Sequence, residues 1–239
     1  MKGASMDRLY IVIPAYNEEA NIEKVIKEWH EVALKYGSDS RLVVVNDGSK
    51  DNTLPLLHGL KEKYERLRVL DKPNGGHGSA VTHGYKYALR KGADYIFQTD
   101  SDGQTDPSEF GDFWKRRKKY AMVIGERSGR QDGFSRVVVT KTLKLVILAI
   151  FHVNVKDANT PFRLMKPEAL EKCLELFEDD YNLPNVIIST AMKKWKYPVC
   201  YRHITFRPRQ GGVNSINIKK IVKIGIKALK DFRTISKRM

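Results

Sequence analysis

Short apolar runs alternate with longer amphipathic segments through the first half of the chain. The apolar runs cover residues 9–14, 42–45, 67–70, 95–99 and 122–125, and they are typical of buried strands. Between them, apolar positions at helical spacing predict helices over residues 22–36, 51–64, 79–91 and 107–119. This alternation predicts an α/β fold with a mostly parallel sheet flanked by helices.

The alternation becomes irregular after residue 125. A polar loop over residues 127–133 is followed by an apolar, lysine-studded segment at 134–151 that we expect to be helical. The longest uncharged stretch, residues 145–155, is much shorter than the roughly 20 apolar residues that span a bilayer. We therefore expect no segment to cross a membrane.

The last part of the chain predicts a basic amphipathic helix over residues 213–239. One face is apolar, with Ile218, Ile221, Val222, Gly225, Ile226, Leu229 and Phe232, and Lys219, Lys223, Lys227 and Lys230 lie opposite. Such a helix either packs on the protein with a solvated basic face or lies on an anionic lipid surface. The sequence leaves both alternatives open.

Composition narrows the class of partner. With 239 residues, 41% hydrophobic and 30% charged, the chain can build one sizeable core. Its net charge of +15 calls for an anionic partner, namely nucleic acid, anionic lipid or a phosphorylated substrate. The two cysteines lack metal-ligand spacing, which favours a reducing, cytoplasmic compartment.

Three acidic, turn-like clusters follow three of the expected strands, at residues 14–19, 46–53 and 100–104. Each alone is typical of a turn or a helix cap. In an open α/β sheet, however, all three face the crevice beyond the carboxyl ends of the strands. Asp100 and Asp102, one residue apart, can approach one hard cation such as Mg²⁺ or Mn²⁺.

A glycine-rich loop at residues 75–79 opens a predicted helix, where backbone N–H groups can meet an anion. The loop lacks the Lys-Ser/Thr ending of a P-loop, so it is weak evidence for ATP chemistry. His77 in this loop could act as a base, although a lone loop histidine is more often incidental.

Four segments of this chain closely resemble glycosyltransferase family 2, whose members share the GT-A nucleotide-sugar-binding fold. They are "IVIPAYNEEANI", "VVNDGSKDNT", "NGGHGSA" and "TDSDGQTDP", in the family's order and roughly its spacing. The resemblance implies a GT-A, Rossmann-like domain at residues 1–212, with a donor half at 1–125 and an acceptor half at 126–212. It also implies Mg²⁺ or Mn²⁺ as cofactor and favours inversion at the anomeric carbon.

The resemblance assigns roles to individual residues. Asp47 would hydrogen-bond the base, Asp100 the ribose or sugar, and Asp102, with Gln104, the metal. The nucleoside pocket and the remaining contacts to the nucleotide-sugar would come from Pro14, Ala15, Tyr16, Glu18, Gly76, Ser101 and Arg209.

The second half is similar to the dolichol-phosphate mannose synthase branch of the family. There, an Arg-x-x-x-Ser/Thr pair handles lipid phosphate, and Arg136 and Thr140 match it; Arg127 and Arg163 are further candidates for the acceptor phosphate. A later Phe-x-x-Arg-x-x-Gly motif is matched by Phe206, Arg209 and Gly212.

The chain departs from this branch in two places. Residues 159–161 read Asn-Thr-Pro where Ser-Gly is usual, and no acid occurs between residues 183 and 199. The missing acid favours a phosphate acceptor, because a hydroxyl needs a general base whereas a phosphate oxygen is already ionised.

We therefore expect a metal-dependent transferase that moves a sugar from a UDP- or GDP-sugar to polyprenyl phosphate, with Asp100, Asp102 and Arg136 as its catalytic residues. It would work peripherally at the cytoplasmic face of an anionic membrane, with its oligomeric state and any membrane partner protein left open. The alternatives are a family 2 enzyme acting on a sugar hydroxyl, a nucleotidyltransferase, and a basic nucleic-acid-binding protein. Residues 15–18 lack the Gly-rich, basic loop of a sugar nucleotidyltransferase, and no nucleic-acid recognition motif is evident.

Overall fold

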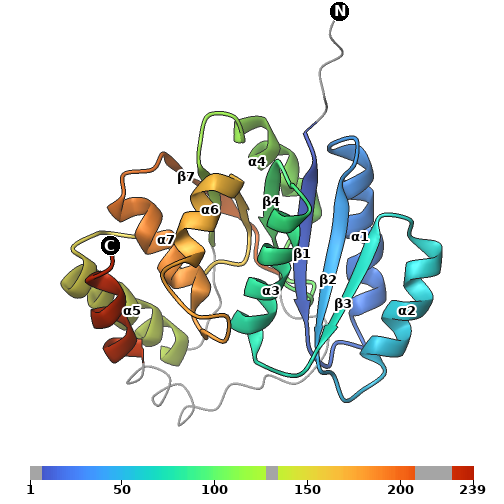
Figure 1. Ribbon diagram of the computed structural model, residues 1–239, viewed down its shortest axis with the longest axis horizontal. Helices are drawn as coiled ribbons and strands as arrows, with labels where there is room; N and C mark the ends of the chain where they lie inside the picture. The colour runs from blue at the N-terminus through green and yellow to red at the C-terminus, as the bar shows by residue number, and fades with distance from the viewer. Residues whose placement is uncertain (1–6, 128–133, 208–227) are drawn as a thin grey trace, which may run out of the picture.

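The computed structural model describes residues 7–127, 134–207 and 228–239, with the side chains of 134–139 left out of the description. A seven-stranded sheet runs through the molecule with helices on both of its faces (Figure 1). The strands are β1 (Leu9–Ala15), β2 (Arg41–Asp47), β3 (Leu67–Lys72), β4 (Tyr95–Gln98), β5 (Met122–Arg127), β6 (Arg163–Met165) and β7 (Val199–Ile204).

In the first half of the chain, the helices lie where the sequence pattern predicts them. The helices between the strands are α1 (Ile22–Lys35), α2 (Thr53–Lys63), α3 (His77–Arg90), the short 3₁₀ turn η1 (Pro107–Glu109), α4 (Phe110–Arg116), α5 (Phe134–Phe151), α6 (Pro167–Leu174) and α7 (Pro184–Lys194). Residues 228–236 form a further helix at the C-terminal end. No helix within the described ranges is both long and apolar enough to span a bilayer.

The strand order is β3-β2-β1-β4-β6-β5-β7, and β6 is antiparallel to both of its neighbours. The other pairs are parallel. The five strands expected from the sequence are present, while β6 and β7 were not expected. Because β1, β2 and β4 run in the same direction, their carboxyl ends meet at one edge of the sheet, where the three acidic loops begin.

Alternating side chains of the sheet divide the core into two layers. Tyr10 and Val12 of β1 face the layer built with α3, α6 and α7, whereas Leu9, Ile11 and Ile13 face the layer built with α1 and α2. Each fully buried large apolar side chain contributes about 1.5–3 kcal/mol to stability. This two-sided burial fixes the strand register, and with it the positions of the loops that follow.

The C-terminal residues join the first of these layers. Phe232 is buried and its ring lies 5.5 Å from that of Phe151 at the end of α5, and Figure 1 shows the two helices side by side. The indole N–H of Trp195 donates to the carbonyl of Met239. The structure therefore shows residues 228–239 packed on the rest of the protein. Residues 218–226, which carry most of the expected amphipathic pattern, and the boundary at residue 212 lie outside the described residues.

Candidate active site

The loops after β1 and β2 are joined by hydrogen bonds between their tips. The Asn17 backbone N–H donates to Ser49 Oγ at 3.0 Å, and the Lys50 N–H donates to Asn17 Oδ1 at 2.8 Å. The Glu18 N–H donates to Thr53 Oγ1 at 2.8 Å. Asn17 has a left-handed φ of 54°, which asparagine tolerates better than most residues. The two loops are thus held together and form one wall beside the carboxyl ends of the strands.

Four residues of this wall were expected to line the nucleoside pocket. Pro14 and Ala15 are buried at the end of β1, whereas Tyr16 is 42% exposed. Glu18 is buried and accepts a hydrogen bond from Asn21 Nδ2 at 2.8 Å. Of the four, only Tyr16 presents an exposed side chain to an incoming ring.

Asp47, at the end of β2, has partners other than the expected base. Its carboxylate is 3% exposed and accepts from Lys72 Nζ at 2.7 Å, from the Gly75 N–H at 3.0 Å and from the Gly76 N–H at 2.7 Å. The structure therefore binds Asp47 to the glycine-rich loop. Lys72 is a residue that sequence reasoning missed, although it stands opposite Asp47 in the register of β2 and β3.

The loop after β4 holds the more open acids. Asp100 is 26% exposed, and its Oδ1 lies 3.0 Å from His77 Nε2 and accepts from Gln98 Nε2 at 3.3 Å. Desolvation lowers the pKa of the His77 imidazole, but the carboxylates of Asp100 and Asp102 outweigh it, so the pKa lies above its ordinary value. His77 and Asp100 therefore connect the glycine-rich loop to the β4 loop.

The neighbours of Asp100 in this loop differ in their accessibility. Ser101 is buried, and Asp102 accepts a hydrogen bond from the Gln104 N–H at 3.1 Å. The Gln104 side-chain amide donates to the Arg207 carbonyl at 2.9 Å, which ties this loop to the chain after β7.

A chain of buried hydrogen bonds from α3 and α7 supports Asp100. The Tyr85 hydroxyl lies 2.9 Å from Gln98 Oε1, and it lies 3.3 Å from Asn185 Oδ1 on α7. Burial raises the pKa of Tyr85, so the hydroxyl stays protonated and can donate. Donation to Oε1 turns the amide nitrogen of Gln98 toward Asp100. Neither Tyr85 nor Gln98 was expected from the sequence, because both read as ordinary core positions.

Two of the arginines expected to meet the acceptor phosphate, Arg127 and Arg163, bind other groups of the protein. Arg127 forms a two-pronged ion pair with Asp157, with both N–O distances at 2.9 Å. Arg163 is fully buried and donates to the carbonyls of Thr160, Asn185 and Ala158 and to Ser189 Oγ. Burial lowers the pKa of the Arg163 guanidinium, which nevertheless remains charged.

These contacts correct the expectation that Arg163 meets the acceptor phosphate, because its nitrogens hold the 158–160 segment against α7 with no exposed surface. Arg136 and Thr140 both lie on α5, four residues apart as expected. The side chain of Arg136, together with Arg209 and Gly212, lies outside the described residues.

Within the described part of the chain, no three His, Cys, Asp or Glu side chains gather closely enough to hold a metal ion by themselves. A Mg²⁺ or Mn²⁺ ion is commonly held by one or two carboxylates together with substrate phosphates. The accessible pair of acids in the β4 loop fits such a shared site and does not fit an all-protein metal cage.

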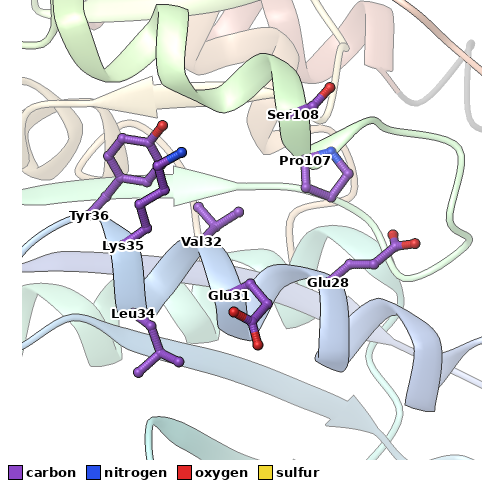
Figure 2. A pocket seen from close by; sticks show the side chains of 8 residues that line it. All are labelled: Glu28, Glu31, Val32, Leu34, Lys35, Tyr36, Pro107 and Ser108. Carbon is purple, nitrogen blue, oxygen red and sulfur yellow. The ribbon is translucent and has the colours of Figure 1, made fainter.

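A hollow of about 440 Å³ lies elsewhere, between α1 and η1 (Figure 2). It is lined by Glu28, Glu31, Val32, Leu34, Lys35, Tyr36, Pro107 and Ser108. None of the residues expected in the active site lines it.

A mostly parallel α/β sheet with acids and a glycine-rich helix start beyond its strands is typical of the Rossmann-like class, whose members bind nucleotides at this edge of the sheet. The family model "Glycosyl transferase family 2" matches residues 10–164, and the chain belongs to this family.

Relatives and solved structures agree with this membership. The dolichyl-phosphate beta-glucosyltransferase ALG5D of Trichomonas vaginalis is 31% identical over 188 residues, which are 71% of this chain and 56% of the relative. An undecaprenyl-phosphate 4-deoxy-4-formamido-L-arabinose transferase of Pectobacterium atrosepticum is 24% identical over 217 residues, 90% of this chain and 64% of the relative. The chain thus spans between about half and two thirds of the length of these relatives.

Glucosyl-3-phosphoglycerate synthase from Mycobacterium tuberculosis, solved with Mn²⁺ and UDP-glucose, shares the fold. Its TM-score is 0.68 at 16% identity, over 98% of this chain and 80% of that chain. The expected GT-A fold is confirmed.

Proposed function

We propose that this protein transfers a sugar from a nucleoside-diphosphate sugar to polyprenyl phosphate at a membrane surface. The observation that carries the proposal is the pairing of His77 on the glycine-rich loop with Asp100 on the β4 loop, next to Asp102. It supports the proposal because backbone N–H groups that could bind an anion and carboxylates that could bind a cation lie at one edge of the sheet. The named activities of the dolichyl-phosphate and undecaprenyl-phosphate relatives support the choice of acceptor.

The donor would lie across the carboxyl ends of the strands. Tyr16 offers a ring surface to the base, and the start of α3 after Gly76 offers backbone N–H groups to the diphosphate. Asp102 and Asp100, with Gln104 nearby, would hold Mg²⁺ or Mn²⁺. A divalent ion bound there would neutralise the charge that develops on the departing diphosphate.

The acceptor would approach from the side of α5. Arg136 and Thr140 stand one helical turn apart on this helix and can serve one phosphate group. Helix α7 contains no acidic residue. A phosphate oxygen is already ionised and attacks without a general base, so this helix needs none. Attack on the anomeric carbon opposite the diphosphate would invert its configuration.

The outer face of α5 supports a location at the membrane. Leu145 is 67% exposed and Leu148 50% exposed, and Lys141 and Lys144 are exposed on the same helix. The helix contains no acid. Exposed leucines beside lysines suit the interface of an anionic bilayer, where each lysine adds about 1 kcal/mol of attraction. We place the protein peripherally on the cytoplasmic face.

The proposal is tested by incubating the full chain with UDP- and GDP-sugars, Mn²⁺ and either polyprenyl phosphate or a soluble sugar acceptor. We expect a lipid-phosphate-linked sugar that fails to form in excess chelator. Transfer to the soluble hydroxyl alone would overturn the acceptor, and absence of transfer from every donor would overturn the donor class.

The membrane placement has its own test. Sedimentation with vesicles containing phosphatidylserine should be weakened by high salt and by the double change Leu145→Ser and Leu148→Ser. Equal sedimentation of wild type and variant would contradict the role of α5. The single change Leu34→Ser, at an exposed leucine on α1, is the control.

A further inference from the structure

Residues 205–207, which follow β7, lie against residues 104–109, which follow the acids of the β4 loop. The Arg207 backbone N–H donates to the Gln104 carbonyl at 2.7 Å, and the Gln104 side-chain amide donates to the Arg207 carbonyl at 2.9 Å. The residues next to this pair form an antiparallel bridge outside the strands of the sheet. The two segments therefore make one continuous contact, which we name the β4–β7 clamp.

Two acids on the β4 side complete the clamp. Asp106 forms an ion pair with the Arg207 guanidinium, and both side chains are partly exposed. The Glu109 carboxylate accepts the Thr205 backbone N–H with both oxygens, at 2.9 and 3.1 Å. Asp106 also accepts from the Ser108 N–H at 3.0 Å, which caps η1. Backbone and side-chain contacts thus join the two segments over their whole length.

The clamp is connected to the acids of the β4 loop. Thr105 Oγ1 lies 2.7 Å from Thr99 Oγ1, and both threonines are buried, so they close the loop at its base. Inside this loop, the Gln104 N–H donates to a carboxylate oxygen of Asp102 at 3.1 Å. A path of direct contacts therefore runs from Arg207 through Gln104 to Asp102.

We propose that Arg207 and Asp106 are positioning residues, whose ion pair holds Gln104 and, through it, the Asp102 carboxylate where a metal-bound diphosphate can meet it. A two-stranded contact of a few residues is marginally stable in water, and a charge-assisted pair restricts its opening. A metal site shared between protein and substrate needs such restraint, because few protein ligands fix the ion. The inference rests on the proposed function, which supplies the metal and the diphosphate.

The partial exposure of the ion pair separates its effect on geometry from an effect on global stability. Partly exposed ion pairs contribute little to the free energy of unfolding. Arg207→Met and Asp106→Asn should therefore leave thermal unfolding unchanged, and asparagine still caps η1. The matched control is Arg202→Met, which removes an ion pair of the same kind, with Asp112, from β7 itself.

Amide hydrogen exchange in the free, full-length protein tests the clamp without any ligand. In wild type, the Arg207 amide should exchange slowly by NMR, because it donates to Gln104. In Arg207→Met and Asp106→Asn, the amide of residue 207 should exchange about tenfold faster relative to its intrinsic rate, the scale of one weakened hydrogen bond. Arg202→Met should match wild type. Unchanged exchange in both clamp variants would overturn the proposal.

Titrations with UDP and Mn²⁺ separate positioning from a direct effect of charge. Arg207→Met removes a positive charge and Asp106→Asn a negative one, so a direct effect of charge would shift binding in opposite directions. Positioning predicts that both variants raise the Mn²⁺ concentration for half-maximal UDP binding about tenfold. Opposite shifts, or none, would overturn the proposal. If wild type binds neither UDP nor GDP, the proposed function fails, and the exchange experiment still decides whether the ion pair holds Gln104.

Discussion

The proposed donor and acceptor sides of the molecule hold their charged residues differently. On the donor side, Asp100 and Asp102 lie in a partly exposed loop, where Asp100 also contacts His77 and Gln98. On the acceptor side, Arg127 and Arg163 are engaged by protein groups, one by a carboxylate and the other by backbone carbonyls. We therefore expect the partly exposed acids to meet substrate more readily than these two arginines.

Loss of a donor-side acid should have the largest effect. We expect Asp102→Asn to lower kcat/KM for sugar transfer on the order of a thousandfold, because a group that stabilises developing charge is lost. Thermal unfolding should be unchanged, since Asp102 lies in an accessible loop. Asp94→Asn, at the opposite edge of the sheet beside Arg8, is the control and should keep full activity. If Asp102→Asn kept its activity, Asp102 would not serve the donor, and the contrast between the two sides would be wrong.

Loss of a buried acceptor-side arginine should act on stability. Arg163→Met leaves the Thr160 and Asn185 carbonyls without their donor, so the free energy of unfolding should fall by about 3 kcal/mol. Urea denaturation measures this change. The KM for polyprenyl phosphate in the fraction that folds should match wild type. If Arg163→Met were as stable as wild type but had a raised KM for polyprenyl phosphate, Arg163 would instead be a residue that contacts the acceptor.

Loss of Arg136, unlike loss of Arg163, should weaken acceptor binding. Arg136→Ala is expected to raise the KM for polyprenyl phosphate about tenfold, the scale of a lost charge-assisted hydrogen bond, without changing UDP or GDP affinity. Steady-state kinetics at saturating donor give the first quantity, and calorimetry gives the second. Lys141→Ala, an exposed cation on the same helix, distinguishes a specific contact from general charge.

The smallest effect is expected at Tyr85, which supports Asp100 through Gln98. Tyr85→Phe removes the hydroxyl that holds Gln98 Oε1, so the Gln98 amide can turn and stop donating to Asp100. We expect about a fivefold rise in the Mn²⁺ concentration needed for half-maximal UDP binding, the scale of one neutral hydrogen bond. Unchanged metal dependence would show that Tyr85 serves the core alone.

The sequence predicted the strands and helices of the first half well because their signals are local. Strand, acid cluster and helix follow one another along residues 9–127, and the spacing alone places Asp100 and Asp102 after β4. The interior partners were missed because they join distant segments: Tyr85 meets Asn185 across 100 positions. Strand β6 has only three residues and β7 carries exposed residues at an edge, so neither produced a clear apolar run. Arg163 was misinterpreted because a buried arginine and a ligand-binding arginine look alike in a sequence.

The antiparallel strand β6 also sets an order of assembly. Among the described residues, strand β5 pairs only with β6 and β7, both of which come later in the chain. During synthesis from the N-terminus, β1–β4 can form a sheet while β5 still lacks hydrogen-bonding neighbours. The buried residues Met122, Val123 and Ile124 must then wait until residue 165 has emerged. The half that holds the donor loops can thus take shape on the ribosome first, and the acceptor half closes onto it afterwards.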